Sequence, residues 1–135
     1  MHDARSTGDR LEIPAELERL HDAREWAGRV AAAAGLGEED RFQVKLATSE
    51  AVTNAIIHGS SGRSSHITLS ASTEDGLLSF EVSDGGTTFT PGEEPVRLIE
   101  GGRGLDLVAM VMDEVQLIRR EEGGLLRFAK RVDSA

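Results

Sequence analysis

Residues 45–59, KLATSEAVTNAIIHG, decide the fold. At 3.6 residues per turn this stretch predicts a helix, which Gly59 and the serine-rich run after it bring to an end. Between Leu46 and Ile57 the only formal charge is Glu50, and its neighbours are small or apolar almost all the way round. A surface helix would spread charged side chains over a solvent face. The stretch therefore predicts a mostly buried helix.

Three polar side chains follow one another along a single stripe of this helix. Asn54 comes one turn after Glu50, and His58 comes one turn after Asn54. A lone carboxylate in a buried helix costs free energy unless a partner compensates it. Two interpretations are open. The stripe lines a polar cavity where chemistry takes place, or Glu50 and Asn54 only form a hydrogen-bonded network inside the core.

Composition bounds the class of protein. The 135 residues, 39% hydrophobic and 29% charged, are typical of one globular domain, which we expect over residues 9–135 after a flexible leader at 1–8. The net charge of −9 disfavours nonspecific binding to nucleic acid or to an anionic membrane. The absence of cysteine excludes disulfides, thiolate nucleophiles and cysteine-based zinc sites. No stretch approaches the roughly 18 apolar residues of a membrane span, so we expect a cytoplasmic location and no membrane contact.

The remaining pattern predicts how the elements follow one another. Alternating residues predict strands, and apolar residues three and four apart predict helices. The order is a strand at 10–15, helices at 16–34 and 38–58, a hairpin of 66–72 and 77–84, a glycine-rich loop at 85–104, a helix at 105–112, and a hairpin of 115–119 and 125–132. This order predicts an α/β two-layer sandwich, in which helices lie on one face of a mixed, mainly antiparallel sheet.

Three segments each have a rationale in nucleotide chemistry. An amide oxygen and a carboxylate on the central helix can orient a Mg²⁺ shell. Asp84, which ends a strand just before Gly86, can accept a hydrogen bond from an exocyclic amine such as that of adenine. The run GGRG at 101–104 opens a helix, where bare backbone N–H groups attract phosphate. The standard phosphate-loop and dinucleotide signatures are absent from the sequence, and its four histidines lack metal-ligand spacing.

Taken together and in this order, SEAVTNAIIHG, DGG and GGRGL resemble the N, G1 and G2 boxes of the GHKL (Bergerat-fold) ATPases. Within that superfamily the chain looks most like the anti-sigma factor serine kinases of the SpoIIAB/RsbW type. The resemblance covers nearly the whole chain and implies the Bergerat, histidine-kinase-like ATPase fold. It also implies ATP and Mg²⁺ as cofactors.

The resemblance implies roles at the matching positions. Glu50 would be the general base, and Asn54 would ligate the Mg²⁺ that bridges the ATP phosphates. Asp84 would bind the adenine amine, with Gly86 making room for the base. The run Gly102, Arg103, Gly104 and Leu105 would close over the phosphates. His58 would support the site from behind, and Arg24 on the first long helix would contact protein partners.

The implied function is that of an ATP-dependent serine kinase and anti-sigma factor. Such a protein sequesters an RNA polymerase sigma factor and phosphorylates a serine of an anti-anti-sigma protein with a STAS domain; a homodimer is expected by the same resemblance. The alternative is a partner-switching module that binds these proteins with little ATP binding or phosphotransfer. Three departures from the family pattern, Thr88, Asp106 and Leu125, favour that alternative.

Overall fold

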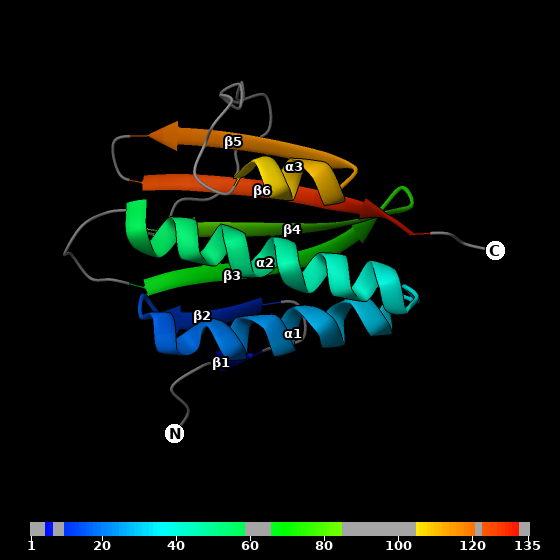
Figure 1. The fold of residues 1–135 in the computed structure, drawn as a ribbon, viewed down its shortest axis with the longest axis horizontal. Helices are drawn as coiled ribbons and strands as arrows, with labels where there is room; N and C mark the ends of the chain where they lie inside the picture. Colours follow the sequence, from blue (N-terminus) through cyan, green and yellow to red (C-terminus); the bar gives the residue numbers. More distant parts are fainter. Residues whose placement is uncertain (1–4, 7–9, 59–65, 85–104, 121–122, 133–135) are drawn as a thin grey trace.

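The computed structural model describes residues 5–6, 10–58, 66–84, 105–120 and 123–132. In this part of the chain a six-stranded sheet, in the order β1-β2-β3-β4-β6-β5, is covered on one face by helices (Figure 1). The strands are β1 Arg5–Ser6, β2 Arg10–Pro14, β3 His66–Glu74, β4 Leu77–Asp84, β5 Glu114–Arg120 and β6 Gly123–Arg131. The helices are a 3₁₀ turn η1 Leu17–Arg19, α1 Leu20–Ala33, α2 Glu38–His58 and α3 Leu105–Val111.

The expected two-layer sandwich is confirmed. We expected a mixed, mainly antiparallel sheet, and every strand pair that the structure describes is antiparallel. The elements follow the predicted order, with ends that differ by a few residues. The loop at 85–104 and the turn after α2 lie outside the described residues. Strand β1 lies within the segment expected to be a leader, and the division into leader and domain stays a prediction.

The turn between β3 and β4 shows how the local sequence sets the register. Asp75 and Gly76 both have positive φ, 54° and 77°, as a two-residue hairpin turn of the primed type requires. Aspartate and glycine tolerate this region better than other residues. The turn pairs Glu74 with Leu77, and the ladder continues as far as Ile67 opposite Asp84.

Small residues let α1 and α2 pack closely on the sheet. Alanines supply much of the buried face of both helices, and a Cβ placed on Gly28 of α1 would lie 3.1 Å from Cδ of Lys45 on α2. Beneath them, Trp26 meets Phe80 edge to face at 5.8 Å between centroids, and Phe80 stacks on Phe128 at 5.4 Å. This geometry is the favoured one for aromatic pairs, and it joins α1 to the neighbouring strands β4 and β6.

The expectation of a mostly buried α2 holds only for one face. Val44, Ala47 and Ala51 are fully or almost fully buried, whereas Phe42 is 64% exposed and Ile57 is 59% exposed. The difference arises because α2 has α1 on one side and the sheet beneath it, which leaves its outer surface in contact with solvent (Figure 1). Within the described part of the chain, no helix has both the length and the apolar character needed to span a bilayer.

The buried hydroxyl of Thr48 gives a first testable prediction. Thr48 is 0% exposed, and its Oγ1 has no hydrogen-bond partner among the residues that the structure describes. Burying an unpaired hydroxyl costs free energy, whereas the valine side chain has the same shape without the polar atom. We expect Thr48→Val to raise the free energy of unfolding by about 1 kcal/mol in urea denaturation.

The reverse exchange serves as the control. Val52 is also 0% exposed on α2, and Val52→Thr should lower the free energy of unfolding by about 1–3 kcal/mol, since it buries a new hydroxyl. A lower stability of Thr48→Val would contradict the prediction and would indicate that the hydroxyl has a partner in solution.

Glu81 gives a second prediction, which concerns pH. Its side chain lies on the sheet face opposite the helices, since it follows Phe80 in the strand, and it pairs across the ladder with Arg127. Burial raises the pKa of Glu81 above its ordinary value of 4.5, and the positive charge of Arg127 offsets part of that rise. The folded chain therefore keeps this proton at a pH where the unfolded chain has already lost it.

Because the folded state then binds more protons, its stability falls as the pH rises from about 4.5 through the raised pKa of Glu81. We expect Glu81→Gln to remove this part of the decline, so that the variant gains stability relative to wild type between acid and neutral pH. Urea denaturation at several pH values measures the difference. Glu74→Gln, a change at an exposed residue that ends β3, controls for the loss of one charge. A constant difference between Glu81→Gln and wild type across this range would contradict the prediction.

Candidate functional site

Helix α2 carries three of the predicted site residues, Glu50, Asn54 and His58, on its carboxyl-terminal half. Glu50 and Asn54 lie one turn apart, and both are partly buried. Thr53 lies between them in sequence. Its hydroxyl donates a hydrogen bond of 2.7 Å to the carbonyl of Ser49 within the same helix. Glu50 and Asn54 thus form the polar pair on this stripe. His58 ends the helix, and its side chain lies outside the described residues.

Asp84 ends β4 and is 7% exposed. Its Oδ1 accepts a hydrogen bond of 2.6 Å from the backbone N–H of Gly124 on β6. Alternation along β4 places Asp84 on the same face as Phe80, the face that the helices cover. A buried carboxylate needs such a donor, and this bond holds its orientation.

The register brings these residues to one end of the molecule. Asp84 pairs with Ile67, the second residue of β3, and β3 begins eight positions after α2 ends. In Figure 1, α2 and β4 end, and α3 begins, toward the same end of the sheet, at the left of the view. Helix α2 packs on both β4 and α3. Leu105, the first residue of α3, is buried at 7% exposure and anchors that helix in the core.

Other predicted residues are not gathered at this end or are not described. Gly86, Gly102, Arg103 and Gly104 lie outside the described residues, so their roles stay predictions. Arg24 is exposed on α1, as a residue that contacts a partner must be.

Two of the three departures from the family pattern are placed. Leu125 pairs with Ser83, so its side chain lies on the sheet face opposite to Asp84. It therefore does not occupy the surroundings of that carboxylate. Asp106 is exposed in the first turn of α3. Thr88 lies outside the described residues.

The donor set fits a metal ion that comes with a nucleotide. Among the described residues, no three histidine, aspartate or glutamate side chains gather closely enough to hold an ion by themselves. Mg²⁺ commonly keeps several waters and takes one or two protein ligands together with substrate phosphates. The amide oxygen of Asn54, as a single protein ligand, suits that mode of binding.

Sequence reasoning missed the contribution of Gly124. Its N–H lies 40 positions from Asp84 in sequence, and any residue except proline carries such a donor. No side-chain pattern could have marked it. Only the neighbouring register of β4 and β6 brings it to the carboxylate.

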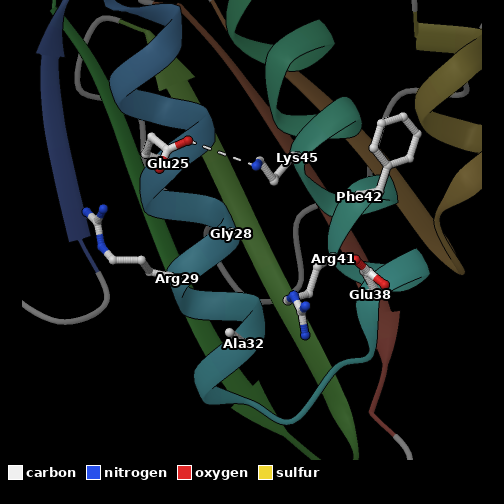
Figure 2. A pocket seen from close by; sticks show the side chains of 8 residues that line it. All are labelled: Glu25, Gly28, Arg29, Ala32, Glu38, Arg41, Phe42 and Lys45. Carbon is white, nitrogen blue, oxygen red and sulfur yellow. Dashed lines mark ion pairs between the residues drawn. The ribbon is translucent and has the colours of Figure 1, made fainter.

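A groove of about 440 Å³ lies elsewhere, between α1 and the amino-terminal half of α2 (Figure 2). Its lining includes none of the predicted nucleotide-site residues and consists of Glu25, Gly28, Arg29, Ala32, Glu38, Arg41, Phe42 and Lys45. Lys45 pairs with Glu25 across it at 3.9 Å, and Arg41 donates to the carbonyl of Leu36 at 3.0 Å. The Glu25–Lys45 pair joins the two helices, and the Arg41 bond holds the loop between them.

Comparison with known proteins agrees with this arrangement. The histidine kinase-like ATPase domain family matches residues 13–130. A protein named serine-protein kinase RsbW, from Listeria innocua, is 32% identical over 120 residues, covering 79% of this chain and 76% of the relative. An anti-sigma F factor from Clostridium acetobutylicum is 34% identical over 93 residues, covering 63% of this chain and 64% of the relative.

A solved structure shares the fold. The structure of the RsbU and RsbW domains of Rv1364c from Mycobacterium tuberculosis matches with a TM-score of 0.70 at 22% identity, over 95% of this chain. This chain spans 34% of that longer protein. On the family match and on the relative from Listeria innocua, this chain belongs to the histidine kinase-like ATPase domain family, the GHKL family that its three motif segments indicated.

Proposed function

We propose that this chain is an ATP-dependent protein serine kinase and anti-sigma factor. It sequesters a sigma factor of RNA polymerase and phosphorylates a serine of an anti-anti-sigma protein with a STAS domain. The observation that supports this most is the position of Glu50 and Asn54 on α2, at the end of the sheet where Asp84 lies buried. A general base, a metal ligand and an adenine acceptor then lie on one side of the molecule.

Asp84 recognises the base of ATP. Its carboxylate accepts a hydrogen bond from the exocyclic amine of adenine while the N–H of Gly124 holds Oδ1 in place. A fixed acceptor loses little conformational entropy when ligand binds. In the proposal, Gly86 leaves room for the ring, and the run Gly102, Arg103, Gly104 and Leu105 closes over the phosphates.

Asn54 contributes the amide oxygen that holds Mg²⁺ on the triphosphate. When bound, the ion neutralises charge that develops on the phosphate oxygens. The residues of this chain do the rest: α2 fixes the amide relative to the phosphates, and the buried face of that helix keeps the site from shifting.

Glu50 accepts the proton of the attacking serine. The serine oxygen forms a bond to the γ-phosphorus, the bond from that phosphorus to the β–γ bridging oxygen breaks, and ADP leaves with the electron pair. The proton of the hydroxyl moves to the carboxylate of Glu50. Phosphoryl transfer asks mainly for positioning and charge neutralisation, which a pair of side chains on one rigid helix can supply.

The names of two relatives support the proposed partners. One is named as a serine-protein kinase and another as an anti-sigma F factor, which are the two activities combined here. The exposed Arg24 on α1 contacts the sigma factor and its competitor, and His58 supports the α2 end of the site. A homodimer and a cytoplasmic location belong to the same proposal.

A second candidate function is a partner-switching module without efficient phosphotransfer. Asp106 favours it, because an exposed carboxylate in the first turn of α3 repels phosphate. Calorimetry with ATP and Mg²⁺ separates the two, because a module of this kind shows no heat of binding at millimolar nucleotide, whereas the kinase binds.

Glu50→Gln tests the role of the base. Glutamine keeps the shape and loses the proton acceptor, so phosphotransfer from labelled ATP to the cognate STAS protein should fall by about 10²–10⁴-fold. ATP affinity measured by calorimetry should change little, since the proposal gives Glu50 no contact with the base or the metal. Undiminished phosphotransfer would remove Glu50 from this role.

Asp84→Asn tests adenine recognition. The variant keeps an oxygen for the N–H of Gly124 but loses the charge that attracts the adenine amine, so the dissociation constant for ATP should rise about 10- to 100-fold. Asp75→Asn makes the same chemical change at the exposed turn between β3 and β4, where asparagine also tolerates positive φ, and should leave the constant unchanged. Equal affinity of both variants would show that Asp84 does not bind the base.

A further inference from the structure

The side chain of Lys130 joins three elements that are far apart in sequence. It comes from β6, and its side chain is 12% exposed. Its Nζ donates to the carbonyl of Val111 at 2.7 Å, at the end of α3, and to Oε1 of Gln43 on α2 at 2.5 Å. The carboxylate of Asp40, also on α2, lies 3.8 Å away. An ammonium group so little exposed is stable only because it has several partners.

These contacts fix the end of α3 against α2. The last carbonyls of a helix have no partner inside the helix, and a cation there is favourable. The neighbouring backbone is held as well, because the N–H of Asp113 donates to the carbonyl of Ala129 and the N–H of Arg131 donates to Oδ2 of Asp113. Of these contacts, only that of Lys130 also reaches α2.

We infer that Lys130 is a positioning residue for the nucleotide site, because it sets where α3 lies relative to α2. This inference rests on the function proposed above. Helix α3 has seven residues and begins with Leu105, which the proposed function assigns to the phosphates, so a displacement of its end is passed to its start. Helix α2 carries Glu50 and Asn54. Lys130 does not touch the reacting groups, since Gln43 precedes Glu50 by seven residues, about 10 Å along the helix.

Lys130→Met tests this inference, because methionine keeps an unbranched apolar stem and removes the ammonium group. The dissociation constant for ATP with Mg²⁺ should rise about tenfold. The rate of phosphotransfer at saturating ATP should stay within about threefold of wild type, since the base and the acceptor are untouched. Lys130→Arg, which restores a cation with several donors, should recover the affinity to within about threefold.

Lys45→Met is the matched control. Lys45 also connects two elements through its ammonium group, but it projects from α2 to Glu25 of α1 at 3.9 Å, and its side chain is 40% exposed (Figure 2). The variant loses the same charge without affecting α3, so its ATP affinity should equal that of wild type. Hydrogen exchange without nucleotide should be faster over residues 105–111 in Lys130→Met and unchanged there in Lys45→Met.

The outcomes separate a positioning role from a purely structural one. A lower melting temperature of Lys130→Met with unchanged affinity for ATP would overturn the inference and leave the proposed function intact. If Lys130→Met does not fold, Gln43→Leu takes its place, because it removes one partner of the same ammonium group. This variant should weaken ATP binding by a smaller factor. Unchanged affinity of the variant for ATP would overturn the inference. Absence of ATP binding by wild type would overturn the proposed function and this inference together.

Discussion

The close packing of α1 and α2 on the aromatic stack of Trp26, Phe80 and Phe128 is the constraint on which the rest depends. Two helices approach this closely only where their facing side chains are small, and here alanines and Gly28 form much of that contact. The stack joins α1 to β4 and β6, and α2 packs in turn against α1 and the sheet. With α2 held in this way, the polar stripe on its second half has a fixed place relative to the end of β4.

Asp84 and the end of α3 are held by partners from distant parts of the chain. Asp84 is oriented by an N–H of β6, and the end of α3 is tied to α2 through Lys130. Both contacts are buried enough to be costly if left incomplete. Strand β6 therefore does more than extend the sheet, since Gly124 near its start holds Asp84 and Lys130 near its end joins α3 to α2, although β6 lies outside every motif segment.

Prediction from the sequence succeeded where the signal was local. A few neighbouring residues were enough to predict three features. These are the turn at Asp75 and Gly76, the alternation in β3 and β4, and the alanine-rich helix α1. The stripe of Glu50 and Asn54 was also local, because helical periodicity alone puts both on one face. The prediction that the helix over 45–59 is mostly buried was wrong on its outer side, where Ile57 is exposed, since composition says which side chains are apolar and not how many neighbours cover them. The sheet face on which Leu125 lies is likewise set by the pairing of β4 with β6. Its place after two glycines in the sequence does not determine that face.

The sequence by itself determined the order of helices and strands, the family and the polar pair on α2, because each of these is carried by residues close together in the chain. Only the tertiary structure decided that Asp84 is buried beneath the helices with Gly124 as its donor, and that Lys130 links α2 to α3. The physical reason is that these contacts join residues separated by 40, 87 and 19 positions, and many chain arrangements share the same local propensities. Strand register and helix packing select one of them, through contacts that no stretch of sequence contains.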